Sequence, residues 1–339
     1  MTHLERLQTT GIRRIGSPKS GFRYRSLNAE TVTKADLKRI DELRIPPAWE
    51  EVAINHAATG RVQVVGRDAA GRWQYLYHAN HTRKQELKKF RRILKFAEAL
   101  PKLRSAISRD LKQTGLGRDR VLATMLRILS TCFMRAGSDV YASENGSYGI
   151  ATLRRQHVKV KGETVSFDFP GKSGVRQQRE ISDRRVAKVI RALLNQPGRR
   201  VFRYQNGDGQ FVDVTTRQIN QYIKEVMGEK FSAKDFRTWA GTLICACALA
   251  RCGCDEEDSK TSRKRKMVAA IKETAEALGN TAAVCKGSYI SPTVLNEFEK
   301  GKIVDNYFPS LQAFLKFRGR TLHSAERSLL KFMKRSATS

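Results

Sequence analysis

The N-terminal part of the chain carries the alternation of hydrophobic and polar side chains that is typical of β-strands. Val62 and Val64 alternate with polar neighbours over residues 61–64, and the aromatic side chains of residues 73–77 follow at the same two-residue period. Between these stretches, residues 68–71 read Asp-Ala-Ala-Gly, which is the composition of a tight turn. The pattern predicts a β-hairpin with the two valines on one face and the aromatic side chains together on one face.

Near residue 82 the hydrophobic residues begin to recur at helical spacing. The stretch RKQELKKFRRILKFAEAL, residues 83–100, is basic, and its apolar side chains recur every three or four residues. We place a domain boundary here. It divides the chain into a β-rich domain over residues 1–84 and a mainly helical domain over residues 85–339.

Within the second domain the pattern predicts a helix, then a hairpin. Hydrophobic residues at steps of three and four predict a buried helix over residues 122–135. Residues 157–160 and 165–169 alternate like the two strands of a hairpin, and they lead into Pro-Gly-Lys-Ser-Gly at residues 170–174. Lys172 is therefore expected at an exposed turn between glycines.

The rest of the second domain has a helical pattern, so the predicted fold class is α+β. Helical spacing resumes at Thr216, and Ser291 followed by Pro292 is a typical start of a helix. The longest apolar stretch, residues 239–250, is too short to cross a bilayer, which takes about 20 residues. We expect it to form a buried helix, and we expect no association with membranes.

The charge of the chain changes the picture from a plain globular protein to one with an acidic partner. There are 64 Lys and Arg against 33 Asp and Glu, a formal net charge of +31. Such an excess repels itself unless something acidic neutralises it, and the commonest such partner is the phosphate backbone of a nucleic acid. A generally basic structural protein is the alternative that charge alone leaves open.

The cysteines and the N-terminus suggest a protein of the cytoplasm, where a nucleic-acid partner would place it on the nucleoid. The N-terminus lacks the continuous apolar core of a secretory signal, and six cysteines are too few to staple a chain of this length. Cys245, Cys247, Cys252 and Cys254 form a cluster that could suggest zinc. Its C-x-C spacings are not those of the usual zinc sites and no histidine lies nearby, so we expect no metal.

No segment has the pattern of an active site that depends on a metal or a nucleotide. The chain has no Gly-rich Walker sequence and no His-Glu-x-x-His motif, so we expect no cofactor. An enzyme that cuts DNA without a metal needs a protein nucleophile, fixed cations for the phosphate oxygens, and an acid for the leaving oxygen. Tyrosine, arginine and lysine can supply these groups, since arginine stays charged and presents a planar fork of donors to phosphate.

Four segments of the second domain resemble, in order and at plausible separations, the active-site blocks of the compact type IB DNA topoisomerases of poxviruses and bacteria. They read FMRAGSDVYASENGSYGIATLRRQHVKV, FPGKSG, KDFRTWAGT and LGNTAAVCKGSYISP. In the first domain, IPPAWEEV and GRWQYLYH are similar to the N-terminal domain of that family. The resemblance covers nearly the whole chain. It implies an enzyme that relaxes supercoiled duplex DNA by transient cleavage of one strand, without metal or ATP.

The resemblance gives roles to five residues of the second domain. Tyr289 matches the nucleophile that takes up a 3′-phosphate and frees a 5′-hydroxyl. Arg135 and Arg237 match the two arginines that neutralise charge on the non-bridging phosphate oxygens. Lys172 matches the lysine on a hairpin loop that acts as general acid toward the departing 5′-oxygen. Lys234 matches a residue that assists the site.

One position departs from the poxvirus pattern, in which a histidine stands nine residues before the nucleophile. Asn280 occupies that place here, as in the bacterial members that this chain resembles. An asparagine can donate a neutral hydrogen bond to a phosphate oxygen, but it carries neither a titrating proton nor a positive charge. We therefore expect Asn280 to bind the phosphate without acid–base work.

In the first domain, Gln74, Tyr75 and Tyr77 match residues that contact bases in the major groove in the poxvirus family. The resemblance also implies the architecture. A small β-rich N-terminal domain would be joined by a basic linker to a mostly helical catalytic domain of the type shared by tyrosine recombinases and type IB topoisomerases. The two would close as a C-shaped clamp around duplex DNA, and we expect a monomer.

Two alternatives have different sequence signatures. Tyrosine site-specific recombinases typically show His-x-x-Arg where this chain has Lys234-Asp-Phe-Arg237, and they lack the IPPAW and WQYLYH segments. A non-catalytic DNA-binding or packaging protein would account for the charge. It would not need Tyr289, Lys172 and both arginines at once.

Overall fold

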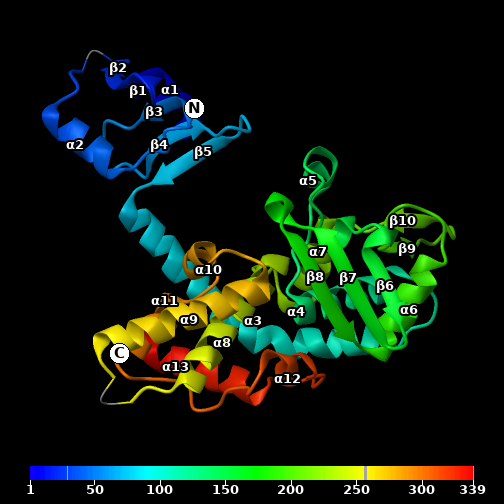
Figure 1. The fold of residues 1–339 in the computed structure, drawn as a ribbon. Coiled ribbons are helices and arrows are strands. Elements are labelled where there is room, and N and C mark those ends of the chain that lie inside the picture. The colour runs from blue at the N-terminus through cyan, green and yellow to red at the C-terminus, as the bar shows by residue number, and fades with distance from the viewer. Residues whose placement is uncertain (29, 256–257, 339) are drawn as a thin grey trace. The chain divides into compact units, whose positions relative to one another are not determined.

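The computed structural model describes residues 1–28, 30–255 and 258–338, which form two units, Met1–Lys89 and Phe90–Ser339 (Figure 1). Each unit contains both helices and strands, and the described strands pair antiparallel, so the fold class is α+β as predicted. Helix α3, Ala79–Asp110, contains both the expected boundary after residue 84 and the division after Lys89. The change of hydrophobic period near residue 82 therefore marks where α3 begins, and the helix continues from one unit into the next.

A five-stranded antiparallel sheet forms the N-terminal unit, in the order β2-β1-β3-β4-β5. The strands are β1 Ile12–Ser17, β2 Gly21–Ser26, β3 Glu50–Ile54, β4 Val62–Arg67 and β5 Trp73–Tyr77. Helix α1, His3–Thr10, supplies Leu7 to one small core, and helix α2, Lys34–Glu42, supplies Ile40 to a second. Strands β4 and β5 pair as the predicted hairpin.

One detail of that hairpin differs from the expected pattern. Val62 and Val64 belong to different core clusters, because a β-bulge lies between them and shifts the register against β5. The polar Gln63 between the valines is buried, and its amide donates hydrogen bonds to the carbonyls of Ala57 at 3.1 Å and Gly60 at 2.6 Å. Gln63 is thus a buried polar residue that stabilises the loop before β4, and its burial breaks the expected alternation of buried hydrophobic and exposed polar residues.

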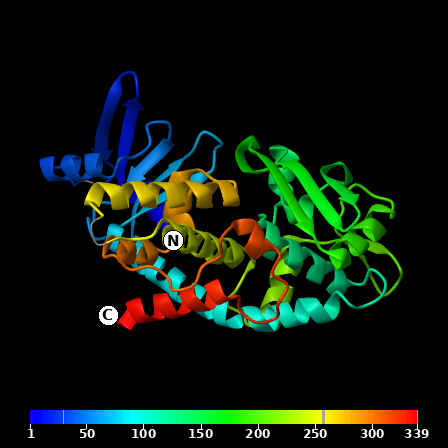
Figure 2. The same ribbon diagram turned by 60° about the horizontal axis from the view of Figure 1, so that its bottom comes forward.

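The second unit is mostly helical and is built around helix α8. Its helices beyond α3 are α4 Arg118–Cys132, α5 Asp139–Glu144, α6 Arg184–Leu194, α7 Thr216–Met227, α8 Ala233–Cys252, α9 Lys260–Leu278, α10 Ala282–Ser288, α11 Pro292–Glu299, α12 Leu311–Leu315 and α13 Ser324–Thr338. Nearly every residue of α8 is buried, which confirms the predicted buried helix over residues 239–250. Helices α9 and α13 both pack against α8 (Figures 1 and 2).

Strands β6 Val158–Lys161, β7 Thr164–Pro170 and β8 Arg176–Ser182 form an antiparallel sheet of this unit. It contains the predicted hairpin, and β7 and β8 are joined by the Gly-flanked turn that carries Lys172. Strands β9 Arg203–Gln205 and β10 Phe211–Asp213 form a separate two-stranded antiparallel sheet. Helix α11 begins at Pro292 with Ser291 as its cap, as predicted. Among the described helices, none is both long and apolar enough to cross a membrane.

Candidate active site

The backbone of Tyr289 is fixed against helix α8. Tyr289 follows the last residue of α10, and its N–H donates to the Cys285 carbonyl at 2.9 Å. Its own carbonyl accepts a hydrogen bond from Thr242 Oγ1 at 3.1 Å. A Cβ atom added at Gly241 of α8 would lie 2.9 Å from Tyr289 Cβ and 2.9 Å from Tyr289 O. The close approach of these two segments therefore requires a glycine at position 241.

Arg237 lies beside the Tyr289 ring, one turn before Gly241 on α8. Its guanidinium carbon is 5.0 Å from the ring centroid, and the residue is only 3% exposed. One Nη donates to the carbonyl of Phe133, and Nη2 donates to the carbonyl of Leu278 at 2.9 Å. Two backbone carbonyls thus orient the guanidinium toward the phenol without neutralising it.

Arg135 and Asn280 are hydrogen bonded to each other, and Arg135 also interacts with Tyr289. Arg135 follows α4, and its carbonyl accepts a hydrogen bond from the N–H of Ile150 at 2.9 Å. Its Nη2 donates to Asn280 Oδ1 at 2.5 Å. The Nδ2 of Asn280 is buried and has no hydrogen-bond partner within the described residues. An orphaned buried donor costs about 1–3 kcal/mol, which favours an acceptor that binds there.

The cations of this cluster change the titration of the phenol. Burial by itself raises the pKa of Tyr289, but the charge and hydrogen bond of Arg237, with the charges of Arg135 and Lys234, outweigh it and hold the pKa below its usual value. Lys234 is exposed on α8, one turn before Arg237, as the spacing predicted. Burial, and then the repulsion of Arg237, lower the pKa of Arg135. The site therefore favours negative charge at the Tyr289 oxygen.

The structure thus brings Tyr289, Arg237, Arg135 and Asn280 together, with Lys234 close by, but it does not bring Lys172 to them. Lys172 lies in the turn between β7 and β8, where Ser173 has a φ of 61° and Gly174 a φ of 73°. Its side chain is exposed, and in the described part of the chain no hydrogen bond or ion pair engages its ammonium group. The lysine is free to approach a ligand.

The three N-terminal candidates lie on β5, in the other unit. Tyr75 and Tyr77 are exposed, and their rings stack with centroids 6.3 Å apart. Gln74 donates through Nε2 to Asp68 Oδ2 at 2.9 Å. The tyrosines thus present a paired aromatic surface.

Among the residues that the structure describes, no group of three or more His, Cys, Asp or Glu side chains could hold a metal ion. Cys245 and Cys247 are buried inside α8, whereas Cys252 is exposed at its end. Within the described residues, the four cysteines considered for zinc form no such group.

Sequence reasoning missed two residues that border the site, Gln177 and Arg179 on β8. Both side chains pack closely against Gly279, the residue before Asn280. A Cβ atom added at Gly279 would lie 2.9 Å from Arg179 Nη2 and closer still to Gln177 Oε1. Neither residue belongs to a segment that carries the family resemblance. Strand alternation was the available signal, because it places both on the same face as the hydrophobic Ile181.

Two family models match this chain. Residues 78–305 match the catalytic core of eukaryotic DNA topoisomerase I, and residues 21–68 match the N-terminal domain of bacterial DNA topoisomerase IB. The segment IPPAWEEV lies within the second match, and the four active-site segments lie within the first.

Individual relatives agree with these models. The DNA topoisomerase 1B of Acanthamoeba polyphaga mimivirus is 35% identical over 88% of this chain and 90% of its own length. That of Vaccinia virus (strain Copenhagen) is 23% identical over 76% of this chain and 77% of its own. Among solved structures, the XerH site-specific recombinase bound to its palindromic difH substrate overlaps with a TM-score of 0.35 and 15% identity, over 59% of this chain and 49% of that chain. The family match sets aside both alternatives, and the chain belongs to the type IB DNA topoisomerases, as a type I topoisomerase enzyme.

Proposed function

We propose that the chain relaxes supercoiled duplex DNA by cutting one strand with Tyr289 and resealing it, without metal or ATP. The single observation that carries this mechanism is the half-buried Tyr289 phenol set among Arg237, Arg135 and Lys234, which lower its pKa. A phenol so placed is prepared to act as a nucleophile on a phosphodiester. The family match supports the overall reaction.

In the cleavage step the Tyr289 oxygen attacks the phosphorus, and the bond from phosphorus to the 5′-oxygen breaks. The product is a 3′-phosphotyrosine and a free 5′-hydroxyl. The phenol loses its proton to solvent, and the 5′-oxygen gains one. Religation is the same step reversed, in which the 5′-oxygen displaces the tyrosine and restores the strand. Rotation of the free end between the two steps removes supercoils, so no other energy source is needed.

Arg237, Arg135 and Asn280 would stabilise the charge that develops on the non-bridging oxygens. The two guanidiniums supply permanent charge, and the unpaired Nδ2 of Asn280 supplies a neutral donor. Asn280 cannot deliver a proton, so its role is confined to binding. Backbone carbonyls already orient the Arg237 guanidinium, and the amide oxygen of Asn280 already orients that of Arg135. These donors need no rearrangement when negative charge develops on the phosphate oxygens.

Lys172 would donate the proton to the departing 5′-oxygen. Its exposed turn leaves the ammonium without a partner in the described residues, so the side chain can reach a bound phosphate. Proximity to other cations disfavours the charged form of an ammonium group and so makes it a better acid. We infer that DNA brings Lys172 to the cluster, because no contact among the described residues does so.

The net charge of +31 and the stacked Tyr75 and Tyr77 support the wider proposal for DNA binding. Together with Gln74 and Lys234, these tyrosines would contact the duplex as the two units close around it in a C-shaped clamp. We propose that the chain acts as a monomer, divided functionally into residues 1–84 and 85–339. Its place in the cell would be the cytoplasm, on the nucleoid.

The test is relaxation of a negatively supercoiled plasmid in EDTA without ATP. We expect relaxation to completion by the parent and none by Tyr289→Phe at equal DNA binding. Relaxation that requires added magnesium or ATP would refute the proposed mechanism.

A further inference from the structure

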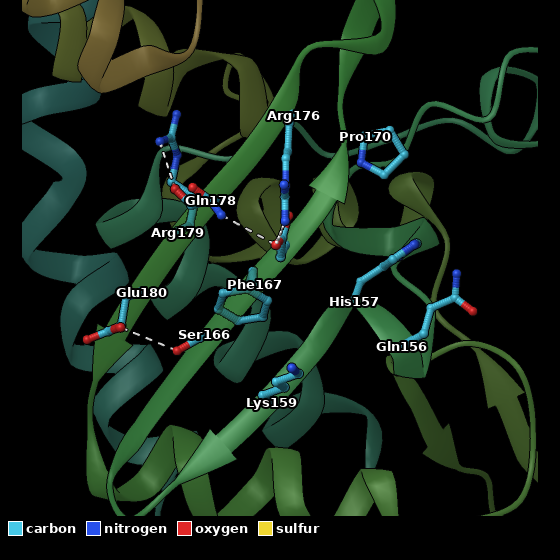
Figure 3. A pocket seen from close by; sticks show the side chains of 11 residues that line it. Gln156, His157, Lys159, Ser166, Phe167, Pro170, Arg176, Gln178, Arg179 and Glu180 are labelled. Carbon is cyan, nitrogen blue, oxygen red and sulfur yellow. Dashed lines mark hydrogen bonds and ion pairs between the residues drawn. The ribbon is translucent and has the colours of Figure 1, made fainter.

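Arg179 is an arginine on the core-facing side of a strand. It pairs with Phe167 across the β7–β8 ladder, and Phe167 is 1% exposed. Residues directly opposite each other on paired strands project to the same face. Figure 3 shows the Arg179 side chain extending away from Arg176, which lies three residues earlier on the same strand. Arg176 lies on the outer face, where its Nε donates to Asp168 at 2.7 Å.

Inside the fold, Arg179 is bound to Gln177. Its Nη2 donates to Gln177 Oε1 at 3.1 Å, and its Nη1 donates to the carbonyl of Gln178 at 3.1 Å. In the described part of the chain, no carboxylate lies within ion-pair distance of Arg179, whereas Arg176 has Asp168. A partly buried cation that is held only by neutral groups retains its full charge for a ligand.

The pair of Gln177 and Arg179 supports the turn that carries Asn280. Gly279 ends helix α9 in the left-handed conformation with a φ of 60°, and both side chains close on the space where its Cβ would stand. Asn280 then donates its N–H to the carbonyl of Ala275 at 2.9 Å and accepts from Arg135. The direction of the unpaired Nδ2 of Asn280 thus depends on a turn against which two side chains of strand β8 pack.

Arg179 also interacts electrostatically with the two arginines proposed to bind the phosphate. Its charge contributes to lowering the pKa of Arg135, behind burial and the charge of Arg237, and Arg237 contributes in the same way to lowering the pKa of Arg179, behind burial. Within the described residues none of these three guanidiniums forms an ion pair with a carboxylate, so an anion that binds among them would stabilise all three. A phosphodiester that gains charge during attack is such an anion.

We propose that Arg179 is a positioning residue for strand cleavage, which holds the Asn280 turn through Gln177 and Gly279 and adds its charge to that of Arg135 and Arg237. This rests on the proposed roles of Tyr289 and Asn280. It extends the site to strand β8, beyond the segments that resemble the family.

The experiment measures single-turnover cleavage of an end-labelled duplex by Arg179→Met, which keeps an unbranched side chain and removes the charge and the donors of the guanidinium. Arg184→Met is the control, because Arg184 is exposed on α6 and lies 3.9 Å from Glu163 in a surface ion pair. We expect Arg179→Met to cleave about 10- to 100-fold more slowly, less than the ~10²–10³-fold loss typical of a direct donor. Arg184→Met should cleave at the parental rate.

A double-mutant cycle tests how Arg179 acts. If it works through the turn, then Arg179→Met should cost much less in an Asn280→Ala background than in the parent. Parental cleavage by Arg179→Met, or a loss that simply adds to that of Asn280→Ala, would overturn the proposal. Should Arg179→Met fail to fold by thermal melting, Gln177→Met removes the same link, and parental cleavage by that variant would overturn the proposal equally.

Tyr289→Phe distinguishes a failure of the proposed active site from a failure of the role proposed for Arg179. Covalent adduct in Tyr289→Phe would refute the proposed site, and Arg179 with it. No adduct in Tyr289→Phe together with parental cleavage by Arg179→Met would refute the role of Arg179 alone.

Discussion

Replacing Gly241 with alanine should misplace the nucleophile while leaving its chemistry intact. The added Cβ would stand 2.9 Å from both the Cβ and the carbonyl oxygen of Tyr289, whereas ordinary van der Waals contact begins at 3.4 Å. The two segments must therefore separate by about 0.5 Å, the difference between these distances. Neither atom lies at the end of a flexible side chain, so the backbone of Tyr289 has to move.

Two consequences of that displacement can be estimated. Overpacking of a close contact costs about 1–3 kcal/mol, which for a unit of this size lowers the melting temperature by roughly 2–4 °C per kcal/mol. A misplacement of about 1 Å can cost on the order of 10²-fold in rate, so a shift half as large should slow cleavage roughly 10-fold. Affinity for duplex DNA should stay near the parental value, because no phosphate-binding group is removed.

The assay is single-turnover formation of the covalent adduct on a denaturing gel, with Gly287→Ala as matched control. Gly287 lies in α10, two residues before the nucleophile, and a Cβ there would meet nothing within 4 Å. We expect the control to cleave normally and to be more stable by about 0.4–1 kcal/mol, as for other compatible Gly→Ala changes. Parental cleavage by Gly241→Ala, or an equal loss in both variants, would refute the argument that this contact positions Tyr289.

Three further predictions concern the acid, the phenol and the clamp. Lys172→Ala should cleave very slowly on an ordinary ester and recover much of its rate when sulfur replaces the bridging 5′-oxygen, a leaving group that needs no proton. Arg135→Ala and Arg237→Ala should recover far less, and equal rescue of all three would show that Lys172 only binds the backbone. Because its neighbouring cations lower the pKa of Tyr289, an ultraviolet titration should show one tyrosine that ionises below the ordinary value. Lys234→Met should move that ionisation upward, and its persistence in Tyr289→Phe would contradict the assignment. DNA affinity should fall steeply with salt, with a log–log slope of about −0.9 for each phosphate contact, and a slope near zero would contradict a clamp.

Much of the fold could be predicted from the sequence because hydrophobic period and local geometry are tightly linked. The β4–β5 hairpin, the buried helix α8 and the start of α11 at Pro292 all follow from patterns within single segments. The separation of Val62 from Val64 could not be predicted in this way. It depends on the hydrogen bonds of Gln63 to a neighbouring loop, and alternation alone carries no information about such partners.

The candidate site shows the same division. Family motifs identified Tyr289, Arg237, Arg135 and Asn280, which the structure brings together from segments far apart in the chain. The contact of Gly241 with Tyr289 and the brace of Gln177 and Arg179 on Gly279 are long-range packing features. Alternation along β8 can place Gln177 and Arg179 on the inner face of the strand, but no local pattern tells which distant residue a side chain contacts. The approach of Lys172 stays a prediction, because it depends on the bound DNA.

The most direct test of the central claim is to trap the covalent complex and map the site of attachment by mass spectrometry. We predict that a 3′-phosphate is joined to the phenol oxygen in the peptide that contains Tyr289, and that Tyr289→Phe gives no adduct while binding the duplex normally. Attachment to any other residue, attachment through a 5′-phosphate, or an adduct that survives in Tyr289→Phe would contradict the account.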